Sequence, residues 1–261
     1  MTGRRGDGAT RRCFGLLSSP RRPVTPSFDL QNMPTDELLT VVGRADELYY
    51  HRAQPGTVRE SVMVLSGARG ASDRYELQWR LARAFFFLGQ EAGSRDSSVG
   101  LYSTGIAAGE RAVALNSERV EGHFWVGVNL ALFAEIKRGI RGVRALRWAR
   151  KELTKAVSIS ESYHDGGPLR VLGRLMHKAP RILGGNTTVS RELFERAIAL
   201  APSNTVTLMY AAELAIETGD RDRAAAFLQR VLESSVDPEW EFESNRDRAR
   251  ARSLLEQLSS S

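Results

Sequence analysis

The stretch from Thr207 to Leu232, TLMYAAELAIETGDRDRAAAFLQRVL, decides the fold class. Its apolar residues recur at three- and four-residue spacing on both sides of Gly219-Asp220, which is the period of two amphipathic helices and not the alternation of a strand. The glycine lies where a left-handed residue ends a helix. Ala212 and Ala224 supply the small side chains that let two helices cross closely. The stretch therefore predicts a helical hairpin.

Three earlier segments share the pattern of its first helix, in which a small residue follows a Leu-like one and precedes a large apolar residue by three positions. The small residues of the four segments are Ala82, Gly127, Gly173 and Ala212. A second helix of related form follows each, as in 190–202, which ends in Pro202. The pattern resembles the tetratricopeptide repeat, in which stacked hairpins need small residues at the helix crossings. We therefore expect these four residues to be buried at crossings.

The helical period extends from Pro34 to Leu258, and no segment alternates as a strand does. We expect helices near 35–51, 56–69, 73–89, 98–116, 119–137, 142–160, 166–178, 188–201, 204–218, 221–234 and 240–258. Gly89, Gly184-Gly185 and Gly219 are expected to cap helix C-termini. The predicted fold is all-α: an α-solenoid of about four tetratricopeptide-like hairpins with flanking N-terminal helices. Helix 240–258, apolar along one side only, is expected to cap the C-terminal end.

Residues 1–27 are rich in Gly, Pro, Ser and Arg, with six arginines against Asp7 alone, and predict a disordered extension before a single helical-repeat domain at 28–261. The apolar run from Cys13 to Leu17 is too short for a secretory signal. Arg11-Arg12 stands where a lipoprotein signal needs apolar residues. The residues alone therefore favour a cytoplasmic location.

Several classes of protein are excluded by composition. Cys13 is the only cysteine, so an internal disulfide and a thiolate zinc site are ruled out. The longest uncharged apolar window, Gly122 to Ala134, is too short for a transmembrane segment. No glycine-rich phosphate loop and no HExxH motif is present. We expect no cofactor and no metal.

A basic run covers residues 137–151, which contain seven Lys or Arg residues and no acid. Arg141, Arg144, Arg147 and Arg150 recur every third residue, which is typical of the solvated face of a helix. An anionic membrane surface, an acidic partner or RNA would also suit such a face. Trp148 is its only aromatic residue, and single-stranded nucleic acids need several stacking platforms, so nucleic-acid binding is not expected.

Two further stretches point to one family. Glu121 to Leu130 contains the run Gly-His-Phe-Trp-x-Gly-x-Asn, and Gly166 to Pro180 contains Gly-Gly-x-Leu-Arg-x-Leu-Gly-Arg before a final Ala-Pro. Across about Tyr75 to Leu232 the chain resembles the T-component family of tripartite ATP-independent periplasmic (TRAP) transporters. The resemblance implies a periplasmic accessory protein without catalytic activity. It implies a solute-binding protein as partner, and an organic-acid or hydrophobic ligand. A cytoplasmic repeat scaffold is the alternative, and self-association is compatible with both.

The repeat register predicts which side chains line the concave groove. Counting the small crossing residue as the eighth position, the second, fifth, ninth, twelfth and thirteenth positions point inward. The residues we single out as the binding groove are Trp79, Arg83, Phe86, Phe124, Arg170, Arg174, His177 and Lys178. One wall would be aromatic and the other cationic with one imidazole, which suits an amphipathic carboxylate or an acidic peptide end. Alternatively, Arg170, Arg174 and Lys178 form a solvent-facing stripe paired with Glu213 and Glu217.

The histidines offer the only catalytic alternative, a helical hydrolase. His164-Asp165 would serve as base and orienting group, with Ser160 or Ser162 as nucleophile. No strand-turn-helix elbow frames either serine, so a polar connector is the favoured interpretation. His123, beside Phe124 in an apolar helix, is interpreted as a hydrogen-bonded packing residue. The sequence therefore predicts a protein that binds and does not catalyse.

Overall fold

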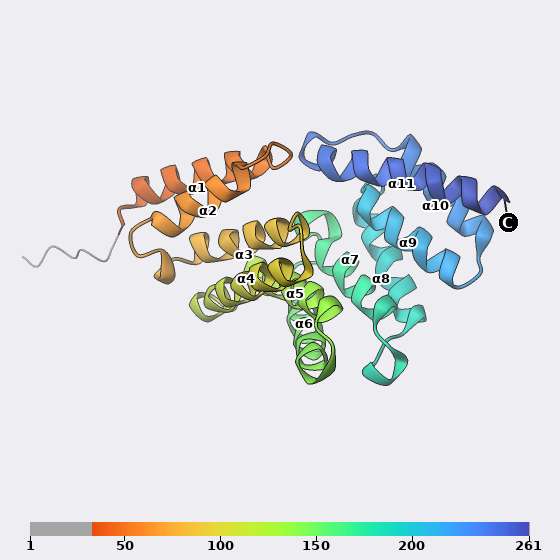
Figure 1. Cartoon of the computed structure of the whole chain (residues 1–261), viewed down its shortest axis with the longest axis horizontal. Coiled ribbons are helices and arrows are strands. Elements are labelled where there is room, and N and C mark those ends of the chain that lie inside the picture. Colours follow the sequence, from red (N-terminus) through yellow and green to blue (C-terminus); the bar gives the residue numbers. More distant parts are fainter. Residues whose placement is uncertain (1–32, 261) are drawn as a thin grey trace, which may run out of the picture. The chain divides into compact units, whose positions relative to one another are not determined.

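The computed structural model describes residues 33–260, and over that range the chain forms eleven α-helices and no strand (Figure 1). The helices are α1 (Thr35–Tyr50), α2 (Thr57–Gly67), α3 (Tyr75–Gln90), α4 (Arg95–Leu115), α5 (Val120–Ile136), α6 (Gly139–Ile159), α7 (Tyr163–Lys178), α8 (Thr187–Leu200), α9 (Thr205–Glu217), α10 (Arg221–Glu233) and α11 (Glu241–Ser260). Three short 3-10 turns are η1 (Ala71–Asp73), η2 (Arg181–Leu183) and η3 (Pro238–Trp240). The all-α expectation is confirmed. The predicted extension 1–27, with Cys13, lies outside the described residues.

Helices α3 to α10 pair as four consecutive hairpins, and the small residues of the repeat lie where the helices cross. Ala82 and Ala212 are fully buried. A Cβ atom on Gly127 would lie 2.7 Å from Leu153 Cγ of α6, and one on Gly173 would lie 2.8 Å from Phe194 Cε1 of α8. Only a residue without a side chain permits such close approach. The predicted register of the crossing residues is therefore confirmed.

The expected helix cap is confirmed at Gly219. Gly184 ends the 3-10 turn η2 and not α7, which ends at Lys178, and the cap expected at Gly89 is wrong. Gly184 and Gly219 adopt left-handed backbone conformations, with φ of 86° and 79°. Gly89 does not end α3, which continues to Gln90. A Cβ on Gly89 would lie 2.3 Å from Cε1 of Tyr102, so the glycine makes room for that ring on α4. Position 89 is therefore a glycine because the ring of Tyr102 packs against it, and not because it caps the helix.

Three helices also begin earlier than the sequence indicated. α4 begins at Arg95 because Ser94 caps it, its Oγ accepting from the Ser97 amide at 3.2 Å. α6 begins at Gly139, so the basic run is helical except for Lys137 and Arg138, which precede the helix. α7 begins at Tyr163 with a turn that is not α-helical, described below.

The C-terminal helix closes the last hairpin as expected and also contacts the first part of the chain. Leu254, Leu255 and Leu258 pack on the core formed by α9 and α10. At the other end of α11, the ring of Phe242 lies 5.4 Å from that of Phe87 on α3. Figure 1 shows the start of α11 beside the connection that follows α1. There Glu243 forms an ion pair with Arg52 at 2.6 Å. The sequence pattern did not indicate this contact.

Candidate functional site

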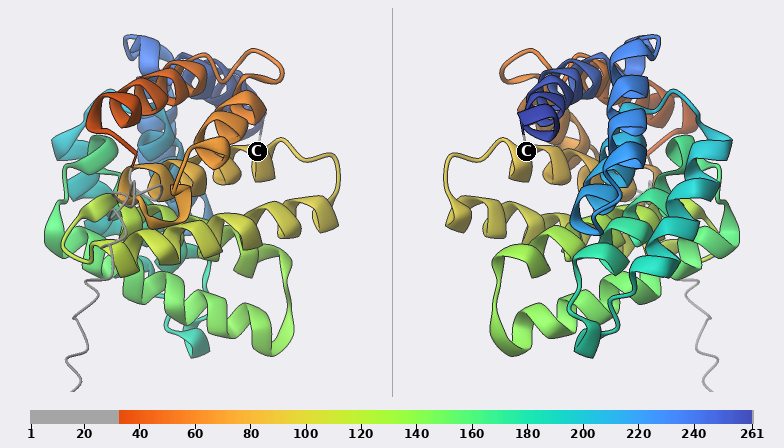
Figure 2. Two further views of the ribbon diagram at one scale, coloured as in Figure 1. Left: turned by 90° about the vertical axis from the view of Figure 1, so that its left-hand side faces the viewer. Right: turned by 90° about the vertical axis from the view of Figure 1, so that its right-hand side faces the viewer.

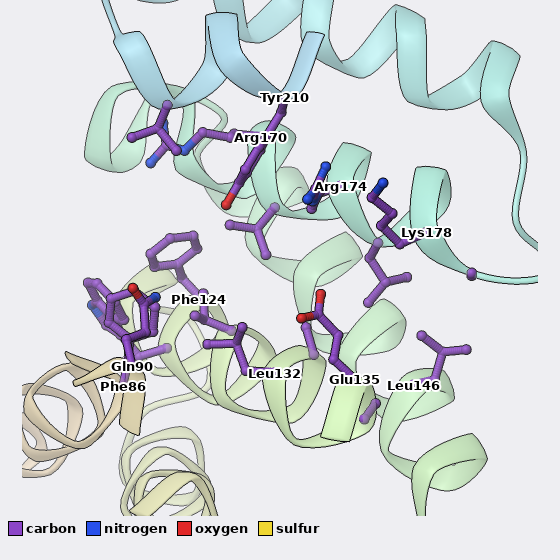
Figure 3. A pocket seen from close by; sticks show the side chains of 18 of the residues that line it. Phe86, Gln90, Phe124, Leu132, Glu135, Leu146, Arg170, Arg174, Lys178 and Tyr210 are labelled. Carbon is purple, nitrogen blue, oxygen red and sulfur yellow. The ribbon is translucent and has the colours of Figure 1, made fainter. Parts of the chain in front are cut away.

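A cavity of about 490 Å³ lies between the inner helices of the hairpins and the η3–α11 segment. This volume is within the usual range of small-molecule sites. Its wall comes from α3, α5, α6, α7, α9 and α11. Figure 3 shows Phe86, Phe124 and Leu132 on one side and Arg170, Arg174 and Lys178 along α7 on the other. The cavity therefore has an apolar wall facing a cationic one.

An aromatic cluster forms the closed end of the cavity around His164. The imidazole centroid lies 5.6 Å from the ring of Phe124, 5.3 Å from Trp125 and 4.7 Å from Trp240. Trp125 Nε1 donates to the hydroxyl of Tyr163 at 3.0 Å. Burial lowers the pKa of His164 well below its usual value, and the nearby Arg170 lowers it further. The imidazole is therefore neutral.

The turn that places His164 has an unusual backbone. His164, Asp165 and Gly166 have φ of 51°, 54° and 75° in succession, a left-handed conformation that side chains disfavour. Asp165 is held because its Oδ2 accepts from Trp240 Nε1 at 2.6 Å. A Cβ on Gly167 would lie 3.0 Å from Phe124 Cζ, so this glycine lets the ring approach the helix start. Residues in such backbone conformations cluster at functional sites.

Arg170 is the most buried cation of the cavity wall, with 3 % of its surface exposed. Its guanidinium donates to the Asp165 carbonyl at 3.0 Å and to His164 Nδ1 at 3.3 Å. His164 must therefore carry its proton on Nε2, because arginine has no acceptor. No carboxylate among residues 33–260 forms an ion pair with Arg170. The carboxylates of Asp165, Glu243 and Asp247 act on this guanidinium only through space. A buried cation without a direct ion pair is costly, so an anion in the cavity would find a favourable site here.

The other two cations along α7 are paired. Arg174 forms an ion pair with Glu213, and Lys178 with Glu217, both on α9. The pairing predicted by the solvent-stripe alternative thus exists for these two residues and not for Arg170. Glu135 of α5 lies across the cavity from these cations (Figure 3), and desolvation raises its pKa above the usual value although Arg174 and Lys178 oppose the shift. Protonation of the Glu135 carboxyl would give the cavity a larger net positive charge.

The structure brings five of the eight predicted groove residues together. Phe86, Phe124, Arg170, Arg174 and Lys178 all line the cavity. Trp79 and Arg83 do not line it, and their contacts lie elsewhere. Arg83 Nη2 donates to Asp46 Oδ1 of α1 at 2.6 Å, and its guanidinium lies 4.0 Å from the ring centroid of Tyr49. Arg83 therefore stabilises the contact between α1 and α3, whereas Trp79 is buried and its Nε1 donates to Glu76 of α3 itself.

His177, the third predicted residue that is not in the cavity wall, faces α9. Its Nε2 lies 2.7 Å from Glu217 Oε2, while its buried Nδ1 has no partner in the part of the chain that the structure describes. Burial lowers the pKa of His177. The imidazole in the cavity wall is instead that of His164, which the sequence analysis assigned to a polar connector.

The residues considered for a hydrolase, Ser160, Ser162, His164 and Asp165, do not contact one another as a catalytic group would. Ser160 and Ser162 lie 3.4 Å apart and share a hydrogen bond with each other. Asp165 accepts from Trp240, and His164 accepts from Arg170. A nucleophile needs a base within hydrogen-bond reach. Neither serine is hydrogen-bonded to His164 among the described residues. Within residues 33–260, no group of three or more His, Cys, Asp or Glu side chains is placed to hold a metal ion.

Four cavity residues could not be found by counting repeat positions. Tyr210 is the sixth position of its repeat, between the expected inward fifth and ninth positions, and Gln90 and Glu135 follow the expected inward positions of α3 and α5. Trp240 comes from η3, which enters the site only because α11 turns back toward α3. The sequence offers one signal for Trp240: it is an aromatic residue in the connector before the largely polar helix α11.

His123 has the role that was expected of it, a hydrogen-bonded packing residue. Its Nδ1 lies 2.6 Å from Glu152 Oε2, and its Nε2 lies 2.9 Å from the carbonyl of Ser117. Both ring nitrogens face acceptors, so both must donate. Although burial opposes it, hydrogen bonding to Glu152 raises the pKa of His123 and lowers that of Glu152.

Comparison with known proteins gives a family and a fold. The family model described as "TRAP transporter T-component" matches residues 94–260. No curated protein matches. Among solved structures, a thermophilic TPR protein of Thermus thermophilus has a TM-score of 0.63 at 18 % identity, over 83 % of this chain and 98 % of that chain. The MamA structure has a TM-score of 0.45 at 16 % identity, over 84 % of this chain and 99 % of that one.

Proposed function

Because the chain belongs to the TRAP transporter T-component family, we propose that it is a non-catalytic accessory subunit of a TRAP-type uptake system and binds its periplasmic solute-binding protein. The family match supports a role in transport, and the tetratricopeptide-like fold is one typical of protein interaction. No helix within residues 33–260 has the length and apolar character needed to cross a membrane.

The ligand that fits the cavity is an amphipathic carboxylate. The observation that supports it is Arg170, a buried guanidinium in the cavity wall with no carboxylate partner among the described residues. Arginine stays charged at every pH a protein meets and binds carboxylates with two parallel hydrogen bonds. Phe124 and Leu132 across the cavity would contact the apolar part of the ligand (Figure 3).

Co-purification tests the proposed partner. The tagged full-length chain, expressed in its native host, should recover the solute-binding protein of a TRAP system in stoichiometric amount. An identically tagged helical-repeat protein of unrelated sequence serves as control. Recovery of ribosomal or cytoskeletal proteins in place of a solute-binding protein would contradict the transport role and favour a cytoplasmic scaffold.

A further inference from the structure

One face of α6 has no role in the proposed function. Arg141, Arg144, Arg147 and Lys151 are exposed at helical spacing, whereas Gly142, Ala145, Ala149 and Leu153 on the opposite side are buried. Arg138 precedes this helix, and Arg181 lies on η2; both are exposed. None of these five arginines forms an ion pair with any residue between 33 and 260. Lys151 lies 3.9 Å from Glu152, and the five arginines make this face a concentration of unpaired positive charge.

Large apolar side chains stand among these cations. Ile182 is 94 % exposed, Ile140 is 73 % exposed and Trp148 is 40 % exposed. Arg150 Nη2 donates to the Leu183 carbonyl at 2.7 Å, which fixes η2 against α6. In Figures 1 and 2, α6 and the α7–α8 connection lie along the same lower edge. We call this surface the α6 face: Arg138, Arg141, Arg144, Arg147, Lys151 and Arg181 with Ile140, Trp148 and Ile182.

We propose that the α6 face docks on an anionic lipid bilayer. Cationic side chains near such a surface attract it, and single apolar residues on projecting turns insert at the level of the headgroups, where tryptophan is also favoured. A protein interface would instead concentrate apolar residues in a core depleted of charge. On the α6 face Ile140 and Ile182 belong to different elements, and each is next to an arginine in the chain, which fits the boundary between headgroups and acyl chains.

Docking through the α6 face would place the cavity close to the bilayer. Arg138, Val143 and Leu146 of the α5–α6 region and Leu183 of η2 line the cavity, so the docked surface and the cavity share the same segments. Docking would hold this part of the cavity wall next to the bilayer. This inference goes beyond the proposed function, because the cavity can bind a carboxylate whether or not the protein contacts lipid.

Vesicle sedimentation tests the proposal on the full-length chain. We expect binding to equimolar phosphatidylglycerol and phosphatidylcholine, and none to phosphatidylcholine alone. Replacing Arg141, Arg144 and Arg147 by Gln should weaken binding about 100-fold, given the attraction per cation at an anionic surface. The matched control replaces Arg59, Arg111 and Arg252, exposed arginines of α2, α4 and α11, by Gln. It has the same net charge and the same residues 1–27, and should retain binding.

Absence of sedimentation by the wild-type chain, or equal loss in the two triple variants, would overturn the proposal. Fluorescence provides a second measurement. Trp148 is the exposed tryptophan, since Trp79, Trp125 and Trp240 are buried. Phosphatidylglycerol brominated near the headgroup end of its acyl chains should quench the emission of wild type and not of Trp148→Phe. Bound protein whose emission is unquenched would also contradict the docked orientation.

Discussion

Gly173 lies where α7 crosses α8, and the space for a side chain there is already filled. A Cβ would lie 2.8 Å from Phe194 Cε1 and 3.3 Å from Leu193 Cβ. We predict that Gly173→Leu lowers the free energy of unfolding by about 1–3 kcal/mol, the usual cost of overpacking. The control is Gly43→Leu, at an exposed position of α1 where a Cβ meets nothing within 4 Å. It should raise the melting temperature slightly, because leucine favours a helix over glycine. Equal melting temperatures for both variants would refute the register.

His123 makes the stability depend on pH in a defined direction. Its folded pKa is raised, so its stabilisation is complete below the unfolded pKa of the imidazole and is lost as pH rises through the folded pKa. Glu152, whose pKa is lowered, stays ionised across that range. We predict that His123→Gln destabilises more at about pH 6 than at about pH 9, as measured by urea unfolding.

His177 should show the opposite dependence of stability on pH and serves as a control for His123. Its pKa is lowered, so the folded protein resists protonation of this group and loses stability as pH falls below the unfolded pKa. The cost of His177→Gln should therefore shrink on acidification. If both variants showed the same trend with pH, the contacts assigned to the two imidazoles would be wrong.

The segment formed by η3 and the start of α11 holds the two ends of the described chain together. Arg52 is buried and forms its ion pair with Glu243 at 2.6 Å, and Arg52 also donates to the Glu239 carbonyl. We predict that Glu243→Gln costs about 3 kcal/mol in the free energy of unfolding, because it leaves a buried charge without its partner. Glu47→Gln, which breaks an exposed pair with Arg44, should cost less than about 1 kcal/mol. Equal effects would show that this segment does not close the fold.

Elements with a strong local signal could be predicted from the sequence. The hairpin at Thr207 to Leu232 has helical periodicity, a left-handed Gly219 and small crossing residues, and it forms α9 and α10 as expected. Gly89 shows the limit of such signals. A glycine near the end of a helix pattern indicates a cap, and only the packing of Tyr102 reveals that it lies inside α3. The sequence alone does not contain that contact.

The repeat register predicts the cavity wall correctly where neighbouring hairpins build it. Arg170 and Phe124 fit the predicted register because α5 and α7 are adjacent repeats. It failed at Arg83, because α1 covers that side of α3, and it missed Trp240, because α11 returns to the first hairpins. Both errors arise from contacts between segments far apart in the chain, which no local pattern specifies.

The carboxylate ligand proposed for the cavity would be bound by Arg170. Isothermal titration of the full-length chain with decanoate and with decan-1-ol tests it most directly, since the two probes differ only in the charged group. We predict that decanoate binds about 10- to 100-fold more tightly, as a hydrogen bond to a charged group would provide. Arg170→Gln should reduce its affinity to that of the alcohol, and Arg111→Gln, on the exposed surface of α4, should leave it unchanged. Equal affinities for the two probes, or decanoate binding that survives Arg170→Gln, would contradict the account.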